Sequence, residues 1–126
     1  MATKRLLIVD DALFMRKRIR EIAESAGWEI AGEAEDGEQA VALYQQENPD
    51  LVTLDIVMPK LDGVSALKQL MQHDPQARVV MVSAVNQRPK LAECIQAGAI
   101  DFIVKPFEKA MLREFFEKSL AAEDKP

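Results

Sequence analysis

Cysteine and histidine are almost absent from this sequence: Cys94 and His73 are the only residues of their kinds among 126. A single cysteine provides neither an intrachain disulfide nor a cysteine-based metal site, and it suits a reducing cytoplasm, where we expect the protein. His73 precedes Asp74-Pro75 in an expected loop, and we interpret it as a solvated residue. Catalysis by histidine or by a thiolate is therefore not expected, and carboxylates are the candidate reactive groups.

Long apolar runs and an excess of basic residues are missing as well. No apolar run approaches the roughly 20 residues of a membrane-spanning helix, and the N-terminus lacks the apolar segment of a secretion signal. Lys and Arg number 16 against 21 Asp and Glu, for a net charge of −5. Because phosphate backbones are bound by clustered basic side chains, nucleic acid is not an expected partner. We expect no membrane partner either.

Strand and helix patterns alternate strictly along the chain, and its length suits one domain. Short apolar runs between turn residues predict buried strands at residues 6–9, 28–34, 51–54, 78–82 and 100–104. Helical spacing predicts helices over about 15–26, 37–47, 64–72, 89–97 and 107–120. Such alternation predicts right-handed crossovers and a parallel α/β sheet with helices on both faces. We expect this single doubly wound domain to fill residues 1–126, with no output domain.

Two of the predicted helices carry specific expectations about side-chain orientation. The first helix is expected to present a basic outer surface, made of Arg16, Lys17, Arg18 and Arg20. The helix from about residue 89 is expected to point three residues into the core, namely Leu91, Cys94 and Ile95.

Four of the predicted strands end in polar residues of definite chemistry: Asp10-Asp11, Asp55, Ser83 and Lys105. In a parallel sheet these ends lie at one edge, which is where open α/β sheets bind ligands. Three converging carboxylates would raise one another's pKa, and a hard divalent cation would relieve their repulsion. Mg²⁺ fits, because it accepts one or two carboxylates and leaves positions for phosphate oxygens. Asp55 would then act as a nucleophile toward a phosphoryl group that Lys105 attracts.

These residues and their neighbours resemble the receiver domain of bacterial two-component response regulators. The motifs that carry the resemblance are Val9-Asp10-Asp11, Asp55 with Met58-Pro59 and Asp62-Gly63, Ser83-Ala84, and Lys105-Pro106-Phe107. The resemblance covers about residues 5–120 and is closest to the stand-alone, CheY-like chemotaxis receivers. It implies a flavodoxin-like, CheY-like fold of five strands in the order 2-1-3-4-5 with five helices, so that the first strand neighbours the third.

The resemblance also implies how the acidic residues act. Asp55 would accept a phosphoryl group from a histidine kinase, which makes the chain a signalling protein and not a classical enzyme. It would assist its own phosphorylation and its slow dephosphorylation. Asp11, Asp55 and the backbone carbonyl of Val57 would ligate Mg²⁺ directly, and Asp10 would act largely through water.

Further implied roles concern the switch and the output surface. Ser83 would be the switch hydroxyl that moves to bond a phosphoryl oxygen, and Lys105 would pair with the phosphate beside a cis Lys105-Pro106 bond. Phe102 occupies the aromatic switch position. Because phenylalanine has no hydroxyl, a rotamer change there would act through packing and not through a hydrogen bond. The face that binds targets or dimerises would include Asn86, Phe102, Val104, Phe115 and Lys118. We expect Phe115 to be at least partly exposed, because a core stripe is complete without it, from Leu112, Phe116 and Leu120.

Three other interpretations share part of this pattern. A flavodoxin-like flavin-binding protein would need a Ser/Thr/Gly-rich phosphate loop after the first strand, where two aspartates stand instead. A haloacid-dehalogenase-type phosphatase would need a second aspartate two residues after its nucleophile, at the position of Val57. A pseudo-receiver, which takes no phosphate, is disfavoured by the complete residue set.

The individual kinase and target stay open at this point, and chemotaxis or motility control is the pathway that we expect from the resemblance. A flagellar motor switch and a histidine phosphotransfer domain both suit the pattern, as does a single-domain regulator outside chemotaxis. The expected state is a monomer, with dimerisation on phosphorylation as a further option.

Overall fold

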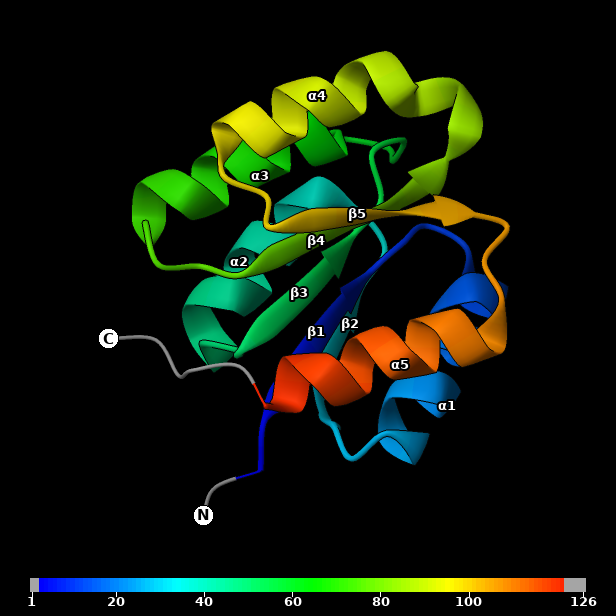
Figure 1. Cartoon of the computed structure of the whole chain (residues 1–126). Coiled ribbons are helices and arrows are strands. Elements are labelled where there is room, and N and C mark those ends of the chain that lie inside the picture. Colours follow the sequence, from blue (N-terminus) through cyan, green and yellow to red (C-terminus); the bar gives the residue numbers. More distant parts are fainter. Residues whose placement is uncertain (1–2, 122–126) are drawn as a thin grey trace.

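A computed structural model describes residues 3–121, in which strands and helices alternate along the chain (Figure 1). A short 3-10 helix, η1, precedes α4 and was not predicted from the sequence. The elements in order are β1 (Arg5–Val9), α1 (Leu13–Ser25), β2 (Glu29–Ala34), α2 (Gly37–Glu47), β3 (Leu51–Leu54), α3 (Gly63–His73), β4 (Val79–Ala84), η1 (Val85–Gln87), α4 (Arg88–Ala97), β5 (Asp101–Lys105) and α5 (Lys109–Leu120).

The five strands form one parallel sheet in the order β2-β1-β3-β4-β5, as the resemblance implies. Figure 1 shows α2, α3 and α4 on one face of the sheet and α1 and α5 on the other. In the pairing of β1 with β3, Val9 lies opposite Leu54. The residues that follow these two, Asp10 and Asp55, therefore leave the sheet side by side.

Two apolar clusters fill the space between the sheet and its two helical layers. Leu7, Val52 and Leu54 belong to the cluster under α2, α3 and α4, whereas Ile8 and Val80 belong to the one under α1 and α5. Neighbouring strand residues fall into different clusters because successive side chains point to opposite faces of a sheet. The sheet is thus buried on both faces, and its carboxyl edge is held by a packed core.

Polar caps and a glycine set several helix ends. Asp36 begins α2 by accepting a hydrogen bond from the Gln39 N–H at 2.8 Å, and Asp62 begins α3 by accepting one from the Ser65 N–H at 2.9 Å. Gly98 ends α4 in the left-handed conformation, with φ at 119°. Between residues 3 and 121, no helix is both long and apolar enough to cross a membrane.

Several expectations about individual residues need correction. Ile95 is 43% exposed, because Leu91 and Cys94 form the inward stripe of α4 and Ile95 lies about 100° further around the helix than Cys94. Trp28 precedes β2 and is anchored by its indole N–H, which donates to the Phe116 carbonyl at 2.9 Å. His73 is the last residue of α3 and is exposed, not part of a loop.

The starts of α5 and of the basic surface on α1 also differ from expectation. α5 begins at Lys109, because Phe107 is buried in the core and Glu108 keeps an extended backbone. On α1, Lys17 is exposed, but the Arg16 side chain is only 12% exposed, so the predicted basic surface is wrong at that residue.

Candidate functional site

Three carboxylates converge beyond the carboxyl ends of β1 and β3. Asp10, Asp11 and Asp55 each offer an oxygen, and these three atoms lie within 4.8 Å of one another. The backbone fixes the approach of the two strands, since the Asp55 N–H donates to the Val9 carbonyl at 3.1 Å. Asp10 and Asp55 are only 1% and 8% exposed, whereas Asp11 faces solvent. The predicted convergence of these aspartates is confirmed.

Lys105, the last residue of β5, reaches across β4 into this cluster. Its Nζ donates to Asp10 Oδ2 at 2.5 Å and to Asp55 Oδ2 at 3.1 Å. The peptide bond that follows it, Lys105-Pro106, is cis, as the resemblance implies. One ammonium thus bridges two of the three carboxylates and offsets part of their repulsion.

Burial and charge shift the pKa values inside the cluster. Burial raises the pKa of the Asp55 carboxyl, and the charge of Asp10 raises it further, although the ammonium of Lys105 opposes both. Burial by itself would lower the pKa of Lys105, but the hydrogen bond to Asp10 and the charge of Asp55 outweigh it and raise that pKa. Lys105 therefore stays protonated, and its single charge does not fully compensate the Asp55 carboxylate.

The buried carboxylates are oriented by backbone donors, and the exposed one is not. The Ala12 N–H donates to Asp10 Oδ1 at 2.9 Å, and the Ile56 N–H donates to Asp55 Oδ1 at 2.7 Å. Among residues 3–121, the Asp11 carboxylate has no hydrogen-bond or ion-pair partner. Its oxygens are thus free to bind a cation.

Ser83 contributes a hydroxyl near the end of β4. It pairs with Val104 of β5, and the next pair in the register is Ala84 with Lys105. Ser83 is 1% exposed, and its Oγ has no hydrogen-bond partner in the described part of the chain. The same is true of Thr53 on β3, a residue that the sequence pattern did not single out. A buried hydroxyl without a partner destabilises the fold by about 1–3 kcal/mol, so each can gain from an incoming acceptor.

The loop from β3 to α3 is drawn tightly against the end of β3. The Gly63 N–H donates to the Ile56 carbonyl at 2.7 Å. A Cβ at Gly63 would lie 1.9 Å from the Asp55 carbonyl oxygen, so only glycine permits this approach. Val57, on the same loop, is 54% exposed and stands two residues after Asp55. The side chain of Val85 lies outside the described part of the structure.

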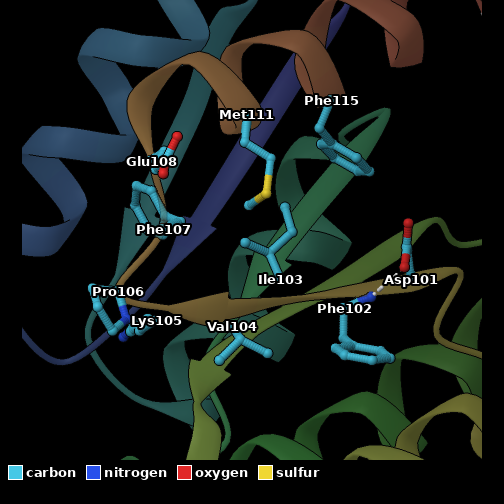
Figure 2. A pocket seen from close by; sticks show the side chains of 10 residues that line it. All are labelled: Asp101, Phe102, Ile103, Val104, Lys105, Pro106, Phe107, Glu108, Met111 and Phe115. Carbon is cyan, nitrogen blue, oxygen red and sulfur yellow. Dashed lines mark hydrogen bonds between the residues drawn. The ribbon is translucent and has the colours of Figure 1, made fainter.

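A second feature is the apolar groove along β5 and α5 that Figure 2 shows. It encloses about 790 Å³, and its lining includes Phe102, Val104, Lys105, Met111 and Phe115. In Figure 2, Phe102 and Val104 point to one side of β5, and Ile103 points to the other, toward Met111. Phe102 is 42% exposed and Phe115 is half-buried against Phe116, which confirms that Phe115 is at least partly exposed.

Comparison with known proteins gives concordant results. The profile of the response regulator receiver domain matches residues 6–117. The chain is 52% identical over 116 residues to the chemotaxis protein CheY of Bacillus subtilis, covering 92% of this chain and 97% of that protein. It is 54% identical over 110 residues to protein CcdB of the same organism, covering 87% and 92%.

Among solved structures, the chain is similar to one in the crystal structure of the CheX-CheY-BeF3-Mg²⁺ complex from Borrelia burgdorferi. The TM-score is 0.87 at 40% identity, covering 95% of this chain and 90% of that chain. This likeness in fold agrees with the profile match over most of the chain and with the sequence relatives. The chain therefore belongs to the response regulator receiver domain family and is CheY-like in sequence and fold.

Proposed function

We propose that this protein is the phosphoacceptor of a two-component system and that it serves chemotaxis. The observation that carries the proposal is the convergence of Asp10, Asp11 and Asp55 within 4.8 Å, with Lys105 bridging two of them. Phosphoryl transfer depends mainly on positioning and on neutralising charge, and neither needs a histidine. This cluster places the Asp55 carboxylate beside the ammonium of Lys105, and a bound cation would supply the remaining positive charge. The relatives named CheY support the pathway.

The donor set suits Mg²⁺. Its candidate protein ligands are hard oxygens, and the Asp11 carboxylate has no competing partner among the described residues. Asp11, Asp55 and the Val57 carbonyl would hold the ion, with Asp10 acting through water. When bound, Mg²⁺ supplies positive charge to the phosphoryl oxygens at a site that Lys105 alone does not neutralise.

Asp55 is the proposed nucleophile. One of its carboxylate oxygens forms a bond to the phosphorus of a phosphohistidine in the kinase, and the bond from phosphorus to the imidazole nitrogen breaks. The leaving imidazole takes up a proton, and the product is an acyl phosphate on Asp55. Lys105, which already contacts Asp55 Oδ2 at 3.1 Å, pairs with the transferred group. The chain thereby assists a transfer without acting as a classical enzyme.

Ser83 is the proposed switch residue. Its buried Oγ lacks a partner among the described residues, and a phosphoryl oxygen would supply an acceptor. Because Ser83 pairs with Val104, a shift of β4 reaches β5 and the exposed Phe102 directly. The groove of Figure 2 is then the surface that changes on phosphorylation and binds a target or a second copy.

The proposed phosphodonor is a histidine kinase in the cytoplasm. Three exposed apolar side chains flank the acidic cluster in sequence and offer it a contact surface: Leu13 (61%), Phe14 (71%) and Val57 (54%). A Phe14→Ala chain should take phosphate from phosphoramidate at the wild-type rate and from its kinase more slowly. Equal slowing with both donors would show that Phe14 supports the structure of the phosphorylation site and does not serve to bind the kinase.

A second candidate is a receiver that serves another pathway or passes phosphate to a phosphotransfer domain. It is favoured by one observation, the 54% identity to a relative that carries a name other than CheY. Binding of the phosphorylated protein to a flagellar motor switch protein supports chemotaxis. Rapid loss of its phosphate to a histidine phosphotransfer domain supports the relay.

The proposal is tested by intact-mass spectrometry after incubation with phosphoramidate and Mg²⁺. We expect one phosphoryl group on the wild-type chain and none on Asp55→Asn, whose amide is a poor nucleophile. Asp101→Asn, an exposed aspartate on β5, is the matched control and should label fully. Full labelling of Asp55→Asn would refute the assignment, and no labelling of the wild type would favour a pseudo-receiver.

A further inference from the structure

Arg16 of α1 is an unusual basic residue, because its side chain is only 12% exposed. A cation this buried is stable only with close partners, and Arg16 has two. Its Nη1 donates to the backbone carbonyl of Asp10 at 2.7 Å, and its Nε donates to Glu33 Oε1 at 3.0 Å. The planar guanidinium can make both bonds at once, which an ammonium cannot do with the same geometry.

The far side of this contact is braced by β2. Glu33 lies on β2 opposite Ile8 of β1, and its second oxygen accepts a hydrogen bond from Arg20 Nε at 2.7 Å. The carboxylate of Glu33, which binds the guanidinium of Arg16, is therefore itself held in place by Arg20. The position of the Asp10 carbonyl follows from this chain of contacts.

The peptide unit that contains the Asp10 carbonyl leads directly into Asp11. The Asp10 and Asp55 carboxylates are each oriented by a backbone N–H and by Lys105. The Asp11 carboxylate has no such partner among residues 3–121, so its direction depends on its backbone. Two side chains hold this backbone: the Asp10 carboxylate accepts a hydrogen bond from the Ala12 N–H after Asp11, and Arg16 holds the Asp10 carbonyl before it.

We propose that Arg16 is a positioning residue for the cation site: by holding the Asp10 carbonyl it orients Asp11 and so sets the affinity for Mg²⁺. The inference rests on the proposed function, since it assumes that Asp11 ligates the ion. Groups that orient metal ligands typically change metal affinity by about 10–100-fold when they are removed. An indirect electrostatic role would act with the opposite sign, because loss of a nearby positive charge favours cation binding.

The test is isothermal titration calorimetry with Mg²⁺ on the full chain, with the melting temperature of each variant measured beside it. We expect Arg16→Met to bind Mg²⁺ about tenfold more weakly than the wild type. Lys17→Met is the matched control, since it removes the same charge from α1 at an exposed position and leaves Arg16, Glu33 and the contact with Asp10 in place. It should bind Mg²⁺ as tightly as the wild type or more tightly.

Arg16→Lys decides the case if Arg16→Met fails to fold, because it keeps the charge and loses the paired bonds. It should also bind Mg²⁺ more weakly. Wild-type affinity in Arg16→Lys, or affinity in Arg16→Met that is equal to or tighter than wild type, overturns the inference. Failure of the proposed cation site would give a different result from failure of the role of Arg16. The wild type would then bind no Mg²⁺, or Asp11→Asn would bind it normally. The inference about Arg16 would in that case fail as well.

Discussion

The acidic cluster and the groove along β5 are built in opposite ways. In the cluster, buried charges are held by named hydrogen bonds: Asp10 by Ala12 and Lys105, and Asp55 by Ile56 and Lys105. The groove is lined largely by apolar side chains, and two of them, Phe102 and Met111, are 42% and 47% exposed. Directional, charge-assisted hydrogen bonds hold the cluster, whereas the side chains of the groove are held by non-directional apolar packing.

The difference indicates a division of labour within one strand. Lys105 takes part in both regions, since it bridges the carboxylates and also lines the groove (Figure 2). Phe102 lies three residues earlier on β5. Lys105 pairs with the carboxylates of Asp10 and Asp55. A change in their charge therefore acts on β5, the strand that also carries the exposed Phe102. Chemistry in the cluster and recognition in the groove should be separable by mutation.

The largest separable effect is expected for Asp11→Asn. The change removes a negative charge and a proposed ligand from the cluster without touching the groove. Loss of an outer-shell group typically weakens metal binding by about 10–100-fold, so loss of a direct ligand should weaken Mg²⁺ binding, measured by calorimetry, by about 100-fold or more, or abolish it between micromolar and millimolar concentrations. The Asp101→Asn control, at the other end of β5, should bind as the wild type does. Normal Mg²⁺ affinity in Asp11→Asn would mean that the ion is held elsewhere.

The complementary effect, in the groove, is expected for Phe115→Ala. Exposed aromatic residues anchor many interfaces, so target binding or phospho-dependent dimerisation should weaken by about tenfold or more while phosphoramidate labelling stays intact. Phe115 is half-buried, and its truncation should destabilise the fold by about 1–2 kcal/mol. The matched change Phe116→Ala empties a fully buried position and should cost about 3–5 kcal/mol in thermal unfolding. Equal destabilisation by both changes would identify Phe115 as a packing residue.

A smaller effect, on the lifetime of the phosphorylated state, is expected in the cluster. Val57 and Val85 stand two residues after Asp55 and Ser83, and neither can orient an attacking water by a hydrogen bond. Hydrolysis of the acyl phosphate should thus be slower than in relatives with amide and acidic residues at these positions. Val57→Asn with Val85→Glu should shorten the phosphoryl lifetime by roughly tenfold. Val57→Ala, which adds no hydrogen-bonding group, should leave the lifetime nearly unchanged. An equal or longer lifetime in the double variant would contradict this reasoning.

The sequence predicts the main chain of this site better than its side-chain contacts. The ends of the strands can be predicted, because a short apolar run that stops at Asp10 or Asp55 indicates a buried strand that ends there. The contact of Arg16 with the Asp10 carbonyl was missed, since it depends on the rotation of α1 against β2 and on Glu33, 17 positions away. Ile95 was misplaced for a related reason, because the rotation of α4 is set by packing on α3 and β4.

The most direct test of the account maps the phosphoryl group itself. Borohydride reduces an acyl phosphate of aspartate to homoserine, so reduction after phosphoramidate treatment marks the phosphorylated residue permanently. Peptide mass mapping should then find homoserine at position 55 and unmodified aspartate at positions 10 and 11. Homoserine at either of those positions, or a phosphate that survives reduction on Ser83, would contradict Asp55 as the phosphoacceptor.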